Sequence, residues 1–163
     1  MLLTNHTSGY GILGHIAITT SNKYEVDMPG KSGLKPSPNN NRHIPIKKWL
    51  SQYDQGKDYV KVYRIKKKSL ASKVGSYAYH QFWAGKYSSG KYVHIKYELT
   101  IRLYSLSPSY CSKLVFQAYY YCSGKEKVVV PTRGFITPYQ VVNSDPRHPI
   151  FYKKYGLHLV KTF

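Results

Sequence analysis

The chain has 163 residues, enough for one domain with a core of its own. Lys and Arg total 25 against 7 Asp and Glu, a formal net charge of +18, and 42% of the residues are hydrophobic. The hydrophobic content excludes a disordered polycation, and the charge predicts a partner that is itself anionic, either nucleic acid or a membrane surface. The few scattered carboxylates disfavour a carboxylate pair or a metal-dependent nuclease. We therefore expect no enzymatic activity, no cofactor and no bound metal.

Residues 1–27 contain one apolar patch, in which Ile16 and Ile18 alternate with smaller residues as in a short strand. Residues 9–14 spell G-x-G-x-x-G, but the polar sequence before them and the Ile/Ala/Thr-rich sequence after them do not fit a dinucleotide-binding turn. The first residues lack the pattern of a signal peptide, and no apolar stretch is long enough to span a bilayer. Any membrane contact is therefore expected to be peripheral.

Residues 28–43 are rich in Pro, Gly, Ser and Asn, a composition typical of a flexible linker or an extended arm. This segment divides the N-terminal segment 1–27 from the remainder of the chain. We predict that residues 44–163 form the globular domain.

A short amphipathic helix is predicted over about 45–53, because Ile46, Trp49, Leu50 and Tyr53 recur at helical spacing. Strands are predicted over residues 59–65, which alternate, and over the aromatic segment 77–83. The clearest alternation runs from residue 92 to residue 104, and this segment is expected to form an antiparallel hairpin with residues 77–83.

The main helix is predicted over about 107–123, with Ser107 as its N-cap, Pro108 in its first turn and Gly124 at its end. Its apolar stripe contains both cysteines, Cys111 and Cys122. We interpret them as reduced core residues, consistent with an intracellular compartment and in the wrong place for a reactive thiolate.

After the main helix, residues 125–132 are a strand candidate, and residues 150–160 are expected to form a closing hairpin that turns at Gly156. Strands and helices joined by short connections predict an α+β fold with an antiparallel β-sheet, one main packed helix and one short helix.

Lysines dominate the charge, with a dense run at residues 66–68. Lys acts as a point charge without bidentate recognition, so the composition indicates sequence-independent contact with phosphates or acidic lipid head groups. The residues predicted to face the anion, whether nucleocapsid or membrane, are Lys47, Lys48, Lys61, Arg64, Lys66, Lys67, Lys68 and Lys73.

The region from Tyr92 to Gly134 resembles the matrix proteins of rhabdoviruses, most closely the short ones of plant viruses. Residues 91–103 are similar to the long strand of that family, 107–124 to its helix and 125–130 to its next strand. The resemblance implies a non-enzymatic viral structural protein that self-associates, condenses the nucleocapsid and bridges it to the anionic inner face of the envelope. Such a protein would be found in the virion, between nucleocapsid and envelope, and in the host-cell cytoplasm.

In that family the N-terminal arm reaches a neighbouring subunit, so the resemblance implies that residues 28–43 lie along the next copy. The residues expected to take part in self-association, including the two aromatic residues of the short helix, are Met28, Leu34, Pro36, Pro38, Trp49 and Tyr53.

Two alternatives remain from the sequence. The first is a sequence-independent RNA-binding protein, such as a ribosomal, movement or capsid protein. The second is a metal-free ribonuclease that uses His80 or His94 with Lys96. Nucleophilic catalysis would require a His to meet a Ser or Cys and an orienting acid in space, and no local motif points to such a group.

Overall fold

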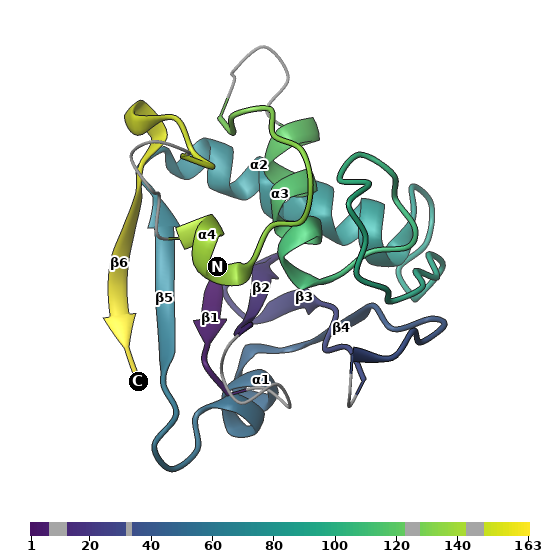
Figure 1. Ribbon diagram of the computed structural model, residues 1–163, viewed down its shortest axis with the longest axis horizontal. Helices are drawn as coiled ribbons and strands as arrows, with labels where there is room; N and C mark the ends of the chain where they lie inside the picture. Colours follow the sequence, from purple (N-terminus) through teal and green to yellow (C-terminus); the bar gives the residue numbers. More distant parts are fainter. Residues whose placement is uncertain (7–12, 32–33, 123–127, 143–148) are drawn as a thin grey trace.

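The computed structural model describes the chain except residues 7–12, 32–33, 123–127 and 143–148. Its centre is a six-stranded antiparallel sheet with the order β4-β3-β2-β1-β5-β6 (Figure 1). The strands are β1 (Leu2–Thr4), β2 (His15–Thr19), β3 (Tyr24–Asp27), β4 (Arg42–Pro45), β5 (Val60–Ile65) and β6 (Leu157–Thr162). The predicted α+β class with an antiparallel sheet is confirmed.

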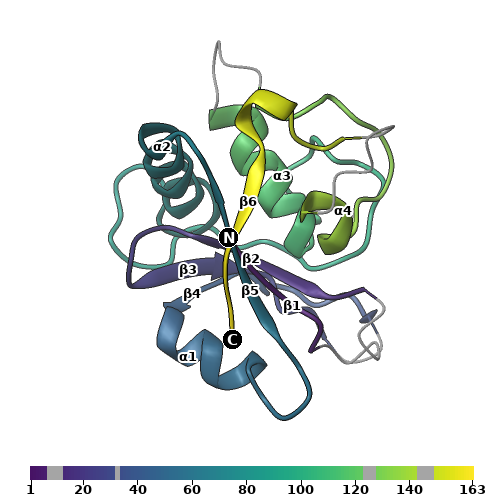
Figure 2. The same ribbon diagram turned by 90° about the vertical axis from the view of Figure 1, so that its left-hand side faces the viewer.

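Helices cover both faces of the sheet (Figure 2). The short helix α1 (Ile46–Tyr53) lies on one face, where the sequence predicts it, and α2 (Lys68–Tyr79) and α3 (Cys111–Cys122) lie on the other. A π-helical segment (His80–Ala84) continues α2, while α4 (Pro138–Val142) packs against α3.

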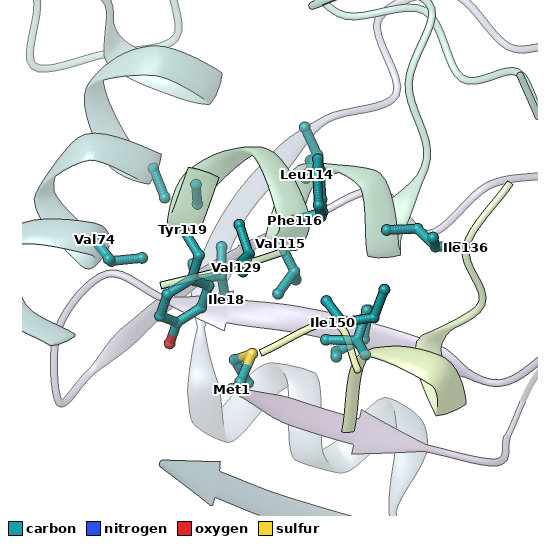
Figure 3. Close-up of a cluster of buried hydrophobic side chains, with 14 of the residues drawn as sticks. Met1, Ile18, Val74, Leu114, Val115, Phe116, Tyr119, Val129, Ile136 and Ile150 are labelled. Atoms are coloured by element: carbon teal, nitrogen blue, oxygen red, sulfur yellow. The ribbon is translucent and has the colours of Figure 1, made fainter. Parts of the chain in front are cut away.

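Alternation along the strands sends neighbouring side chains to different cores. Leu2 of β1 packs in a small cluster with Trp49 of α1, whereas Leu3 belongs to the larger core under α2 and α3. Figure 3 shows this larger core, in which Tyr119 of α3 lies among side chains from β2 and α2, including Ile18 and Val74. The sheet is thereby buried on both faces along its centre.

The predicted hairpin of residues 77–83 with 92–104 is wrong. Residues 77–83 belong to α2 and its π-helical extension, and residues 92–104 have no strand apart from an isolated bridge at Tyr97. The backbone there bonds to irregular partners instead: the Tyr97 N–H donates to the Ser37 carbonyl and the Asn40 N–H to the Ile95 carbonyl. Of the alternating apolar side chains, Ile95, Tyr97 and Leu103 are buried in the core, whereas Leu99 and Ile101 are exposed, so the period of two reflects neither a strand nor one continuous buried face.

The C-terminal prediction is also corrected. Within the described part of 125–132, Val129 forms a single bridge with Phe151, and a short 3-10 helix (Lys153–Tyr155) follows. The last strand, β6, pairs with β5 rather than folding back at Gly156.

The main helix begins at Cys111, four residues later than Ser107, because residues before it are bonded elsewhere. The Ser109 N–H donates to the Lys96 carbonyl, and the Ser109 carbonyl accepts from the Glu98 N–H. The Tyr110 carbonyl accepts the first helical bond, from Leu114, at 3.0 Å. Cys111 therefore lies in the first turn of α3.

The segments on either side of the predicted linker contribute strands to the same sheet. Residues 1–27 supply β1, β2 and β3 of the sheet that also contains β5. Within 28–43, Met28 is buried, Ser37 bridges Tyr97, and Arg42 begins β4.

Gly75 provides a test of how α2 packs on the sheet. In an isolated helix, Gly75→Ala would stabilise by roughly 1 kcal/mol. Here the added Cβ would lie 2.9 Å from the Thr19 carbonyl oxygen and 3.1 Å from that of Thr20. We expect destabilisation by about 1–3 kcal/mol in urea unfolding. The exposed Ser72→Ala on the same helix should not lose stability, and a stabilised Gly75→Ala protein would contradict this packing.

Candidate active site

A partly exposed cysteine lies at the start of α3, on the wall of a pocket. Cys111 is the first residue of the helix and lines a cavity of about 260 Å³. Its thiol is hydrogen-bonded to the imidazole of His15 and to the backbone amides of Ile16 and Ser112. Cys111 is free and packs against the core, as the sequence predicts, but the later start of the helix places it in the first turn, where it also lines the pocket.

His15 is the first residue of β2, and its side chain is buried at the end of the sheet. Its Nε2 lies 2.7 Å from Oδ2 of Asp27, which leaves Nδ1 to meet the thiol of Cys111. The ring also packs near the aromatic residues of α1, with centroid distances of 6.0 Å to Trp49 and 5.1 Å to Tyr53. The imidazole is thus fixed in orientation by neighbours on three elements.

Asp27 ends β3 and is the orienting acid of the site. Its carboxylate accepts two hydrogen bonds from Arg42, from Nε at 2.6 Å and from the guanidinium NH2 at 2.9 Å, and one from Trp49 Nε1 at 3.0 Å. Burial alone raises the pKa of Asp27, but the hydrogen bonds and charges of His15 and Arg42 outweigh it and hold the pKa below its usual value. The residue is therefore ionised at neutral pH.

Glu25 lies on the same face of β3, two residues before Asp27, and is fully buried. Neither of its carboxyl oxygens has a hydrogen-bond partner among the described residues. Burial, together with the negative charge of Asp27, raises the pKa of Glu25 to about 10 against the opposing effect of Arg42. Glu25 is therefore neutral, and Asp27 carries the negative charge of this cluster.

The paired charges favour a thiolate opposite an imidazolium. Burial lowers the pKa of His15, but Asp27 and Cys111 outweigh this effect and raise it to about 9. Burial raises the pKa of Cys111, but the contact with His15 and the two backbone amides outweigh it and lower the pKa. A cysteine at a helix start beside a cationic histidine is the environment in which thiols become nucleophilic.

The pocket in front of Cys111 is largely apolar, with tyrosines around it. Its aliphatic, aromatic and proline lining comes from Leu13, Met28, Leu34, Leu99, Phe135 and Pro138. Tyr53, Tyr97 and Tyr110 also line it, and its polar side comes from His6, His15, Lys31 and Ser112. Such a cavity accommodates a hydrocarbon chain better than a polar substrate.

Two buried polar residues of α3 form hydrogen bonds with the segment of the chain that leads into this helix. Lys113 Nζ donates to the Pro108 carbonyl at 2.7 Å and to Ser105 Oγ at 3.1 Å. Gln117 Nε2 donates to the carbonyls of Leu103 and Ser105, both at 2.7 Å. These bonds fix the approach to Cys111 relative to the helix. Among the described residues, no three His, Cys, Asp or Glu side chains are grouped to bind a metal ion.

The residues predicted to face an anion lie in two places. Lys47 and Lys48 are exposed on α1, on one face of the sheet. The others lie in β5, in the short connection after it and in α2. Three of them, Arg64, Lys66 and Lys68, line a second cavity, distinct from the Cys111 pocket. The remaining members of this group, none of which lines the Cys111 pocket, are Lys61, Lys67 and Lys73.

Several residues predicted for self-association surround the site instead. Met28, Leu34 and Tyr53 line the Cys111 pocket, and Trp49 is fully buried beside Asp27. Pro36 and Pro38 are exposed in the segment before β4.

The histidines of the ribonuclease alternative do not line the Cys111 pocket. His80 and His94 are exposed, and Lys96 forms an ion pair with Glu98 at 2.6 Å.

The sequence analysis missed the site formed by Cys111, His15 and Asp27, because these three residues are far apart in sequence and none belongs to a local motif. The usable signal was a histidine on an early apolar strand combined with a cysteine near a helix start.

A thiol, an imidazole and a buried carboxylate that contact one another in this order have the arrangement found in proteins with a cysteine nucleophile. A family model described as lipoprotein N-acylation protein LnsA-like matches residues 1–163, so the chain belongs to that family. It is also 36% identical over 163 residues to an uncharacterized 30.3 kDa protein of Bacillus thuringiensis, covering all of this chain and 56% of that protein. The chain thus spans about half the length of this curated relative. No solved structure matches.

These findings correct the functional prediction. The viral matrix role and the virion location are wrong, because the family is one of lipoprotein N-acylation and the relative is bacterial. The family description also conflicts with the expectation of a protein without enzymatic activity. The resemblance of residues 92–134 to rhabdovirus matrix proteins is tested by neither finding. Within the described residues, no helix is both long and apolar enough to cross a membrane.

The lowered pKa of Cys111 predicts fast alkylation at neutral pH. At pH 7 we expect iodoacetamide to modify Cys111 at least about tenfold faster than Cys122, because the thiolate reacts and burial raises the pKa of Cys122. Mass spectrometry of tryptic peptides measures both rates in one sample. A midpoint for Cys111 alkylation at or above about pH 8.5, the value of a free thiol, would contradict the ion pair.

Asp27→Asn tests the orienting acid. Loss of the carboxylate lowers the pKa of His15, so the thiolate loses its cationic neighbour and the alkylation midpoint of Cys111 should rise by about one pH unit or more. Glu25→Gln is the matched control on the same strand, because Glu25 is already neutral and should leave the midpoint unchanged. Circular dichroism verifies that both variants fold, and equal midpoints in the two variants would rule out this role for Asp27.

Proposed function

We propose that this protein is an acyltransferase that carries an acyl chain as a thioester on Cys111 and passes it to an amine. The observation that supports this best is the partly exposed Cys111 thiol, bonded to His15 and opening into an apolar pocket. The family description, which concerns N-acylation of lipoproteins, indicates an amine as the acceptor. The comparisons give no donor, and the apolar pocket supports an ester of a fatty acid.

In the first half-reaction the Cys111 thiolate attacks the carbonyl carbon of the donor ester. A carbon–sulfur bond forms, and the carbonyl electrons move onto oxygen. When the tetrahedral intermediate collapses, the carbon–oxygen bond to the leaving alcohol breaks, and the His15 imidazolium gives that alcohol its proton. The products are a Cys111 thioester, a free alcohol and a neutral imidazole, which Asp27 holds in place at 2.7 Å.

The start of α3 can stabilise the oxyanion of this intermediate. The amide of Ser112 is in the first helical turn, whose N–H groups have no partner within the helix, and it already contacts the sulfur of Cys111. The Ile16 amide approaches the same sulfur from β2. These donors lie where negative charge develops beside the reacting bond.

In the second half-reaction an amine attacks the thioester carbonyl. Neutral His15 accepts a proton from the attacking nitrogen, the carbon–sulfur bond breaks, and the thiolate of Cys111 is restored. The net change is an ester and an amine converted to an amide and an alcohol. Because the pocket is lined by apolar side chains, it limits the access of water that would otherwise hydrolyse the thioester.

Trapping of the acyl-enzyme tests the proposal. We expect incubation with p-nitrophenyl octanoate to increase the intact mass by one octanoyl group in place of a hydrogen, and hydroxylamine to remove it. Cys122→Ala is the matched control, because it leaves Cys111 as the cysteine that can be labelled, and it should label like the unchanged protein. Cys111→Ala should not label, and His15→Ala should label at least about 100-fold more slowly.

Transfer is tested by adding a short peptide with a free N-terminal amine to the labelled protein. Amide formation that depends on Cys111 is the expected result. Labelling of Cys111→Ala, or release of free octanoate as the product at saturating peptide, would refute an acyltransferase.

A further inference from the structure

Exposed aliphatic side chains collect at the mouth of the Cys111 pocket. Leu34 and Leu99 line the pocket and are nevertheless 40% and 37% exposed. Ile101, two residues beyond Leu99, is 74% exposed. An aliphatic group next to the entrance of an apolar cavity is unusual on a protein that carries so much charge.

Backbone bonds hold the two segments that carry these residues side by side. Ser37 and Tyr97 exchange a pair of hydrogen bonds of 3.0 and 2.7 Å, and the Asn40 N–H donates to the Ile95 carbonyl at 2.9 Å. The Tyr97 ring also lies so close to Gly30 that a Cβ there would be 3.0 Å from it. Figure 1 shows both segments on the side of the molecule away from β5 and β6. Leu34 and Leu99 are therefore carried to the pocket mouth by two joined segments, and Ile101 lies on the continuation of the second segment beyond Leu99.

The same segments carry exposed cations. Lys31, Lys35 and Arg102 are exposed, and Lys31 lines the pocket. The acid of this region, Glu98, forms an ion pair with Lys96. The rim thus combines apolar groups with uncompensated positive charge, the combination that binds the interface of an anionic bilayer. Nucleic acid would match the charge but would leave the aliphatic groups without a partner.

We propose that this pocket rim, formed by Leu34, Leu99 and Ile101 with Lys31, Lys35 and Arg102, docks on the surface of an anionic lipid bilayer. Docking there opens the pocket toward the acyl-chain region, so a chain can move from the bilayer to Cys111 without crossing water. The purpose of docking rests on the proposed acyltransferase function, while the docking itself is measured independently of it.

Vesicle flotation tests the rim. The unchanged protein should bind vesicles of phosphatidylglycerol and phosphatidylcholine, and bind vesicles of pure phosphatidylcholine far less. Ile101→Asp should weaken binding to the anionic vesicles at least about tenfold, because an apolar contact becomes an anion facing an anionic surface. Ile101 does not line the pocket, so the variant leaves the site intact.

Leu159→Asp is the matched control. Leu159 is an exposed aliphatic residue, 49% accessible, on edge strand β6 away from the rim. Because Leu159→Asp changes the charge as much as Ile101→Asp does, it controls for the added negative charge. The Leu159→Asp protein should bind vesicles with an affinity within about twofold of that of the unchanged protein. Equal losses in both variants, or no loss in either, would overturn the proposal.

Two further arms separate the alternatives. Substitution of Lys66 and Lys68 by Ser should leave vesicle binding within about twofold of that of the unchanged protein. A loss confined to that variant would overturn the proposed docking of the rim and assign binding to the lysine run.

Cys111→Ala should bind vesicles normally, and Ile101→Asp should still accept the soluble octanoyl ester. Failure of the proposed acyl transfer therefore appears in the labelling assay and failure of docking in flotation.

Discussion

The buried carboxylate of Asp27 is the constraint on which the site depends. An isolated charge at this depth would cost several kcal/mol, so it requires charged partners with good geometry. Arg42 of β4 and His15 of β2 supply the charges, and Trp49 of α1 adds a neutral hydrogen-bond donor, all at 2.6–3.0 Å. The same carboxylate therefore joins three neighbouring elements and orients the imidazole. Glu25, buried on the same strand without a hydrogen-bond partner among the described residues, is tolerated because it stays neutral.

The cationic imidazole transmits this constraint to the thiol. Asp27 raises the pKa of His15, and the charge of His15 together with the backbone amides of α3 and β2 near the sulfur lowers the pKa of Cys111. Each group would revert toward its neutral form if its partner were removed, since burial acts against both charges. The lowered pKa of Cys111 is consequently a property of the sheet end, the helix start and α1 together, rather than of a local sequence.

Sequence patterns were sufficient for the antiparallel α+β class and for the short helix, because Trp49 and its neighbours repeat at helical spacing around one buried face. They failed where backbone pairing was decided by distant residues. Ser107 and Pro108 are good helix-start signals, but Ser109 is held by Lys96 and Glu98, so α3 begins at Cys111. That shift places Cys111 in the first turn of the helix, beside His15 and on the wall of the pocket. His15 and Asp27 were equally hidden, since only the pairing of β2 with β3 brings them together.

The net charge of +18 does not distinguish a structural polyanion-binding protein from an enzyme that works at an anionic surface. What distinguishes them is where the apolar and catalytic groups lie relative to the charge. A coat or matrix protein needs cations spread over a face, whereas here Lys31 and the exposed aliphatic residues Leu34 and Leu99 line the same cavity as the Cys111 thiol. Moving an acyl chain from a bilayer into water costs roughly 0.8 kcal/mol per CH₂. In the proposed docking, a rim that enters the interface removes most of this cost, because the chain then passes from the bilayer into the pocket without exposure to water.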